Sequence, residues 1–401
     1  MSTTTAKAFW IKLGIFLTPI LLYLGSTMGL GFRAGEFTSL RAVAERQAGS
    51  APLTYGRAYR DNYFAFKLVS ARVRKPRLLV LGSSRAMQFR AQLASRDPAA
   101  FYNAGGAVQG IFEVKPFLEG LASHDALPRI LILGLDQPWF NSNSPRVMIR
   151  NRMQAQLDEE ETTPLNRALN VSKSIFLDMV KGQIDPRQVL AGTDPHTGLP
   201  ALGLSALLKG SGFRNDGSYQ YGSFANPQPT PSRLAEGFQR LKDNSDHFAG
   251  GDRVGSPALR ELESLLAYCR DKGILVYGYS PPYAPSICAA MATDGKHAYL
   301  KASADSLAGI FARAGRPYAD FSDPTAIGGT DGDMIDAFHG SERLYLGIFL
   351  SLGSRSGGEL DPYSDLAALD KTFRDSAPSQ LLVFGPAVPV AGSADPVAPA
   401  P

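Results

Sequence analysis

Three residues that lie far apart in the sequence have the types that a serine nucleophile requires. Ser84 follows the apolar run Leu78–Leu81, and a short apolar run that ends in a tight turn is typical of a buried strand. His339 lies in a late polar loop, three residues after Asp336. A histidine can take the proton of a serine hydroxyl, and a carboxylate can fix the tautomer of that histidine. The set predicts Ser84 as nucleophile, His339 as general base and Asp336 as the carboxylate that orients it.

The other histidines form no comparable pattern. His124, His247 and His297 lie in helical or polar surroundings, and His196 lies in the turn Asp-Pro-His-Thr-Gly. An Asp-x-x-His spacing by itself is also common where a carboxylate caps a loop beside a surface histidine, and taken alone it favours that simpler interpretation. The Asp336–His339 pair becomes significant because its loop is expected at the same edge of the predicted sheet as Ser84.

Strands and helices alternate along much of the chain. Apolar runs predict five strands, at Leu78–Leu81, Phe101–Asn103, Ile130–Asp136, Ile274–Ser280 and Pro317–Phe321. Helical segments are expected at Ala86–Leu93, Gln109–Leu121, Pro257–Lys272, Lys296–Gly315 and Ser341–Leu352. This rhythm indicates an α/β fold with a parallel, doubly wound sheet, in which sites form beyond the carboxyl ends of the strands.

Four short motifs lie at or near these strand ends. In chain order they are Gly82-Ser-Ser-Arg85, Asn103-Ala-Gly105, Gly134-Leu-Asp136-Gln137 and Asp336-Ala-Phe-His339. Together they resemble the four sequence blocks of the SGNH (GDSL-type) hydrolase superfamily, over residues 77–140 and 257–353. The resemblance implies a three-layer α/β/α sandwich with a central parallel five-stranded sheet and a Ser–His–Asp catalytic set.

The resemblance also implies an oxyanion hole. It would use the backbone N–H of Ser84 or Arg85 together with that of Gly105, and the neighbouring positions Asn103 and Gln137 are further candidates for substrate binding. Loss of one oxyanion donor typically costs about 3–4 kcal/mol of transition-state stabilisation, so these donors matter to the chemistry.

The chain departs from the family pattern at two positions. Ser83 stands where the family usually has Asp, at a position that is mainly structural. Asp136 stands where the family has an Asn that donates to the oxyanion, and an ionised carboxylate there would repel the oxyanion. Either Asp136 is protonated, or it orients Arg85, or another N–H takes the place of the Asn, with Gln137 as a candidate.

The Gly-Ser-Ser-Arg motif, an N-terminal apolar segment and a large insertion resemble one branch of the superfamily. Its members are membrane-tethered, extracytoplasmic proteins that modify cell-surface polymers. The resemblance implies a serine-dependent O-acyltransferase or esterase that acts on a cell-envelope polysaccharide, with acetyl as the expected acyl group and no cofactor. A membrane-bound O-acyltransferase is the expected protein partner.

The N-terminal segment Leu13–Phe32 is uncharged and mostly apolar. Roughly twenty helical residues span a bilayer core. Lys7 and Lys12 precede the segment, which favours a cytoplasmic N-terminus. We therefore expect a single-pass anchor in the plasma (inner) membrane with the globular part extracytoplasmic, that is, periplasmic. A cleaved signal peptide and a buried core helix are the competing interpretations.

The chain divides into four parts by composition and pattern. The expected parts are a cytoplasmic stub and anchor (1–32), a juxtamembrane connector (33–76), an SGNH-like domain (77–386) with an insertion at 141–255, and a disordered tail (387–401). Within the insertion, Asp216–Gly222 could contact a ligand through its two tyrosines, or form a plain turn and an edge strand. Gln380–Phe384 could add a further edge strand.

Composition narrows the classes of function. The 401 residues carry a net charge of only +4 and no basic block, which argues against a nucleic-acid partner. No zinc-type Cys/His spacing is present. Cys269 and Cys288 could pair in an oxidising compartment or remain isolated buried thiols.

Two other functions fit some of the same residues. The first is an inactive SGNH-like scaffold that binds glycan or the O-acyltransferase partner, which the carboxylate at Asp136 favours. The second is a sugar-phosphate binder, in which Gly82–Arg85 would cradle a phosphate at a helix start. The second leaves Asp336 and His339 without a role.

Overall fold

A computed structural model describes residues 3–59, 63–144 and 164–385. At its centre is a parallel five-stranded sheet in the order β3-β2-β4-β8-β9. The strands are β2 (Leu78–Gly82), β3 (Phe101–Gly105), β4 (Ile130–Gly134), β8 (Leu275–Ser280) and β9 (Tyr318–Asp320). The five predicted strands and the α/β architecture with a parallel sheet are confirmed.

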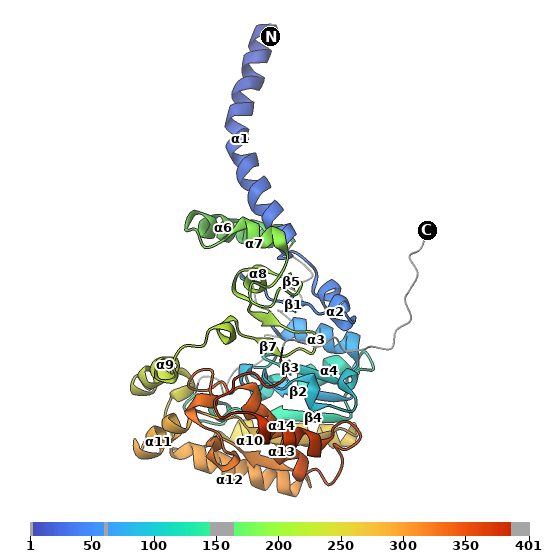
Figure 1. The fold of residues 1–401 in the computed structure, drawn as a ribbon, viewed down its shortest axis with the longest axis vertical. Coiled ribbons are helices and arrows are strands. Elements are labelled where there is room, and N and C mark those ends of the chain that lie inside the picture. Colours follow the sequence, from blue (N-terminus) through green and yellow to red (C-terminus); the bar gives the residue numbers. More distant parts are fainter. Residues whose placement is uncertain (1–2, 60–62, 145–163, 386–401) are drawn as a thin grey trace.

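Helices cover both faces of this sheet (Figure 1). Along β2, Leu79 and Leu81 pack into one core and Leu78 and Val80 pack into the other. One face is covered by α3 (Tyr63–Arg74), α4 (Val114–Ala122), α10 (Ser256–Asp271) and α12 (Ala298–Arg313). The other is covered by α13 (Glu342–Ser354) and α14 (Leu366–Asp375). Because neither face meets water, the strands are mainly apolar.

The chain after β2 does not form the helix predicted at Ala86–Leu93. It forms two short 3-10 turns, η1 (Ser84–Ala86) and η2 (Ala91–Leu93). The Asn103 side-chain amide donates to the carbonyls of Ala86 (2.9 Å) and Phe89 (2.8 Å). These carbonyls are therefore held by a tertiary contact from β3, and the prediction from local sequence was wrong.

The connector and the insertion together build a second, smaller sheet. Strand β1 (Thr54–Tyr55) lies between β5 (Ala201–Leu202) and β6 (Gly212–Phe213), and β7 (Tyr219–Gln220) pairs with β6. The surrounding helices are α2 (Leu40–Ala48), α6 (Pro164–Val180), α7 (Pro186–Ala191) and α8 (Leu204–Lys209). Two more helices, α9 (Thr230–Lys242) and α11 (Pro285–Thr293), lie at the opposite end of the protein (Figure 1).

The N-terminal helix α1 (Thr3–Ala34) projects away from the globular part (Figure 1). Within the described residues, Thr5–Ala34 is the one helix long and apolar enough to cross a membrane, and none of its most apolar stretch is buried. The backbone N–H of Gly203 donates to the Ala34 carbonyl (2.6 Å), which fastens the end of α1 to the smaller sheet.

The C-terminal end of the described chain packs without forming a strand. At Gln380–Phe384, the N–H groups of Val383 and Phe384 donate to the Glu342 carboxylate (3.0 and 3.2 Å). A side chain thus takes the place of the edge-strand pairing suggested for this segment. The tail expected to be disordered, 387–401, lies outside the described residues.

A buried charge network joins the insertion to the main domain. Arg90 contacts both Asp216 and Glu342, and all three side chains are almost fully buried. Burial alone would raise the pKa of Asp216, but Arg90 and the hydrogen bonds from Ser218 and Ala91 lower it to about 2. The loop that contains Asp216 is thereby held against the β2–β3 connection.

Replacement of Arg90 by Met is expected to destabilise the fold by about 3–5 kcal/mol, because the buried carboxylates of Asp216 and Glu342 would lose their closest cation and keep only the more distant Arg214. Urea unfolding of the full-length chain in detergent measures the change. Arg41→Met, which breaks the exposed Arg41–Glu45 pair, is the control, with an expected cost of about 0–1 kcal/mol. If Arg90→Met does not fold, Glu342→Gln tests the same network with a milder change. Equal stability of both variants and the control would contradict the prediction.

Candidate active site

The structure brings Ser84, His339 and Asp336 together beyond the carboxyl end of the main sheet. The Ser84 hydroxyl lies 2.8 Å from Nε2 of His339, and Nδ1 of His339 lies 2.7 Å from the Asp336 carboxylate. These distances are within hydrogen-bond reach. The arrangement allows His339 to accept the hydroxyl proton while Asp336 holds the opposite ring nitrogen.

Local turn chemistry fixes Asp336 relative to His339. Asp336 accepts hydrogen bonds from the backbone N–H groups of Phe338 (2.9 Å) and His339 (2.8 Å), as an aspartate does in a tight turn. The turn is closed by Ile335, whose N–H donates to the His339 carbonyl (2.7 Å). We call residues 334–340 the histidine loop.

The contacts of Asp336 set the charge of its carboxylate. Burial alone would raise the pKa of Asp336, but the His339 imidazole and the N–H groups of Phe338 and His339 lower the pKa below its ordinary value. Asp336 is therefore ionised at neutral pH and able to stabilise a protonated His339.

The guanidinium of Arg85 points away from Ser84 and into the protein. It donates to the carbonyls of Phe338 (3.1 Å), Pro281 (2.8 Å) and Pro282 (2.7 Å), and to the Gln137 side-chain oxygen (2.6 Å). Phe338 belongs to the histidine loop, the two prolines follow β8, and Gln137 follows β4. Arg85 thus links three separate segments at the edge of the sheet.

Asp136 supports the turn that carries Ser84. The Ser83 hydroxyl donates to Asp136 (2.7 Å) and accepts the backbone N–H of Arg85 (3.1 Å). Burial alone would lower the pKa of Arg85, but Tyr283 and Asp136 beside it raise the pKa above its ordinary value. Asp136 therefore reaches the Arg85 backbone through the Ser83 hydroxyl.

The remaining oxyanion candidates are engaged in structural contacts. The Gly105 N–H donates to the Asn103 side-chain oxygen (2.6 Å), and the Asn103 amide is held by the 3-10 turns. A Cβ at Gly105 would lie 2.8–2.9 Å from the backbone of Ala86 and Met87, so the glycine allows this close approach. Among the described residues, the Ser84 N–H is the one proposed donor that has no acceptor.

The insertion contributes an aromatic wall that the sequence only suggested. The segment Asp216–Gly222 forms both a turn and the edge strand β7, and the Tyr219 N–H donates to the Met87 carbonyl (3.1 Å). This contact places the Tyr221 ring 6.1 Å from the His339 ring. Burial raises the pKa of Tyr221 well above its ordinary value, so its hydroxyl remains a neutral hydrogen-bond donor beside the site.

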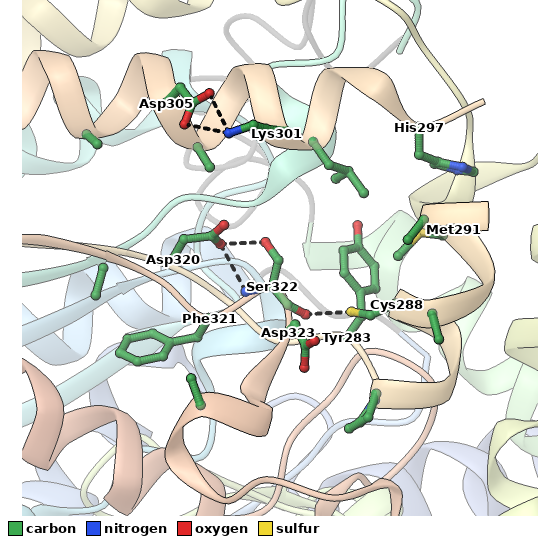
Figure 2. A pocket seen from close by; sticks show the side chains of 18 of the residues that line it. Tyr283, Cys288, Met291, His297, Lys301, Asp305, Asp320, Phe321, Ser322 and Asp323 are labelled. Carbon is green, nitrogen blue, oxygen red and sulfur yellow. Dashed lines mark hydrogen bonds and ion pairs between the residues drawn. The ribbon is translucent and has the colours of Figure 1, made fainter. Parts of the chain in front are cut away.

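A separate groove of about 1090 Å³ lies between α11, α12 and the segment after β9. Figure 2 shows its lining, where the Cys288 thiol donates to the Ser322 carbonyl. Ser84, Asp336 and His339 do not line it. Cys269 and Cys288 are both free, and burial raises the pKa of each thiol to about 12. The isolated-thiol interpretation therefore holds, and neither cysteine is suited to nucleophilic chemistry.

No family model, curated protein or solved structure matches this chain. Within residues 3–59, 63–144 and 164–385, no cluster of three or more His, Cys, Asp or Glu is arranged to hold a metal ion. The geometry of Ser84 and its partners is therefore the basis for assigning a function.

Replacement of Arg85 by Lys is expected to loosen the histidine loop, because one ammonium cannot reach acceptors on three segments. A displacement of about 1 Å can cost up to about 100-fold in rate, so labelling of Ser84 by a fluorophosphonate should slow about 10- to 100-fold. Circular dichroism checks that the variant is folded. Arg96→Lys, at an exposed arginine that donates to the Asp361 carbonyl, should label at the normal rate. An unchanged rate in folded Arg85→Lys would show that Arg85 does not position the loop.

The lowered pKa of Asp336 predicts a specific pH dependence of stability. Its folded-state pKa lies below the unfolded value of about 3.9, so its contribution is present above about pH 4 and is lost as the pH falls through the folded-state pKa. The difference in unfolding free energy between wild type and Asp336→Asn should be largest near neutrality and narrow below about pH 4. Urea titrations across this range measure it, and a difference that widens in acid would contradict the sign.

Proposed function

We propose that this protein transfers an acyl group through an acyl-serine formed at Ser84. The observation that carries the proposal is the continuous contact from the Ser84 hydroxyl through His339 to the ionised Asp336. The order of the motifs along the chain and the strand order of the main sheet agree with an SGNH-like three-layer sandwich.

The chemistry follows from the positions of the three side chains. The Ser84 hydroxyl attacks the acyl carbonyl and gives its proton to Nε2 of His339. The leaving group departs with that proton, and the acyl group remains on Ser84. A second hydroxyl then attacks and its proton passes to His339. The bond between the acyl group and Ser84 breaks, and His339 returns the proton to the Ser84 oxygen. Attack by a sugar hydroxyl gives transfer, whereas attack by water gives hydrolysis.

The acyl acceptor is proposed to be a cell-envelope polysaccharide, with acetyl as the transferred group. The two lysines before α1, Lys7 and Lys12, favour a cytoplasmic N-terminus. With α1 as a single-pass anchor in the plasma membrane, Ser84 would lie on the extracytoplasmic side. A membrane-bound O-acyltransferase would then supply the acyl group from across the membrane.

A second candidate is a scaffold of the same shape that binds glycan or the O-acyltransferase without acyl transfer. The observation that favours it is the engagement of the expected oxyanion donors. The Gly105 N–H donates to the Asn103 side-chain oxygen, and the Arg85 N–H donates to the Ser83 hydroxyl. Asp136 has a carboxylate where the family has the amide of an Asn. In this resting geometry, the Ser84 N–H is left to stabilise an oxyanion.

The two candidates are separated by the reactivity of Ser84. On the acyl-serine proposal, a fluorophosphonate labels the wild-type protein, and Ser84→Ala abolishes the label. His339→Ala should slow labelling by about 10⁴-fold or more, because the residues of such a set act as a unit. Intact-protein mass spectrometry of the full-length chain measures the adduct.

The chain provides a matched control for this experiment. Ser123 and His124 form an exposed serine–histidine contact of 2.9 Å on the surface, and His124→Ala should leave labelling unchanged. Labelling of the wild type that persists in Ser84→Ala would disprove the assignment of the nucleophile. A wild-type protein that is folded but never labelled would favour the scaffold.

A further inference from the structure

The helices beside the base of α1 expose a second apolar surface. The inner side of α6 is buried, with Val171 and Ile175 in a small core. Its outer side carries exposed apolar side chains, which continue onto α7. We call this set the α6–α7 apolar face; it consists of Leu169, Phe176, Leu177, Val180 and Leu190. A helix that is apolar on two opposite sides needs a second partner besides the protein core.

Contacts with α1 place this face at the level of the membrane. The Phe176 ring packs edge-on against the Tyr23 ring, with centroids 5.1 Å apart. Tyr23 lies inside the apolar stretch of α1, about 13 Å along the helix from Phe32. Figure 1 shows α6 and α7 beside the C-terminal end of α1, where this helix joins the globular part. If α1 crosses a bilayer with Phe32 near its edge, Phe176 lies among the acyl chains, and α7, which contacts Arg33, lies near the headgroup boundary.

Further contacts hold the two helices in this position. Arg33, in the last turn of α1, donates to the Leu190 carbonyl of α7 (2.5 Å). The aliphatic side chain of Ile175 lies against Gly31 of α1. The face therefore cannot move away from the membrane helix without breaking contacts on both α6 and α7.

The charges around the face suit a lipid surface without dominating the interaction. Lys173, Lys181 and Arg187 are exposed beside it and can meet anionic headgroups. Asp178 and Asp185 lie among them and offset two of these charges. The apolar side chains must therefore supply most of the attraction, and salt should weaken it only slightly.

We propose that the α6–α7 apolar face is immersed in the leaflet on the side of the globular domain, as a helix pair that reaches from the headgroup boundary at α7 into the acyl chains at the Phe176 end of α6. The proposal rests on membrane anchoring by α1, which is part of the proposed function. A single helix would let the domain swing about its point of exit. A second contact area beside it fixes the tilt of the domain, and with it the height of Ser84 above the membrane.

Tryptophan quenching by brominated phosphatidylcholine tests this placement in the full-length chain reconstituted in vesicles. Of the two native tryptophans, Trp10 in α1 is 66% exposed, whereas Trp139 is fully buried. Quenching of the wild type therefore reports on α1. In a Trp10→Phe background, Phe176→Trp then reports on the face. We expect it to lose fluorescence in brominated lipid to an extent comparable with Trp10.

The control and a second variant use the same background. Phe238→Trp is the control, because Phe238 and Phe176 are both 42% exposed, but Phe238 lies on α9 at the far end of the protein. It should not be quenched. Leu190→Trp tests the face independently if Phe176→Trp does not fold.

The outcomes separate the two proposals. A wild type that is not quenched shows that α1 does not insert, so anchoring itself fails. A quenched wild type with unquenched Phe176→Trp and Leu190→Trp leaves the anchor in place and overturns the lipid contact. In native membranes, p-benzoylphenylalanine in place of Val180 should form lipid adducts on illumination. A discrete adduct with a protein would overturn lipid as the occupant and assign the face to a membrane-protein partner.

Discussion

The arrangement of the candidate site depends on one buried guanidinium. Arg85 follows Ser84 in the chain, yet its side chain donates to the histidine loop through the Phe338 carbonyl and to the segments after β4 and β8. Removing a charge from water is costly unless its donors are satisfied. The donors of Arg85 are satisfied only while each of these acceptors stays in place. A shift of the histidine loop away from the Ser84 turn would therefore leave the Arg85 charge partly unpaired. The position of His339 relative to Ser84 is therefore coupled to the packing of the sheet edge.

The same charge accounts for the carboxylate at Asp136. A buried Arg85 favours a nearby negative group, and Asp136 supplies it while binding the Ser83 hydroxyl. The turn is stabilised, but the position no longer offers an amide to an oxyanion. On the proposed function, the oxyanion of an entering acyl group meets the Ser84 N–H. A second donor requires displacement of the contact between Gly105 and Asn103, or arrives with the acceptor or a partner protein. A site of this kind would react slowly with free esters, which is a useful property where transfer rather than hydrolysis is required.

Much of this could be predicted from the sequence, and the limits have physical causes. The five strands were predictable because a sheet covered on both faces needs uninterrupted apolar runs, and the placement of Ser84 opposite His339 followed from where parallel strands end. The 3-10 turns after β2 were not predictable, because their carbonyls accept hydrogen bonds from Asn103, a side chain on another strand. The acceptors of Arg85 are mostly backbone carbonyls, which any residue provides, so its linking role left no signal. The two-residue strands of the smaller sheet are too short to show periodicity.

The insertion connects the α1 end of the protein to the candidate site. At one end, the Ala34 carbonyl of α1 accepts the Gly203 N–H beside β5. At the other, Asp216 is held by the buried Arg90, and the Tyr221 ring lies beside His339. The smaller sheet joins these two ends through β1 and β6. Each link is a packed or hydrogen-bonded contact, so a continuous set of contacts joins α1 to the wall of the site. On the proposed function, a polymer or acyl donor presented at the membrane surface would meet Ser84 at a height and orientation set by the insertion.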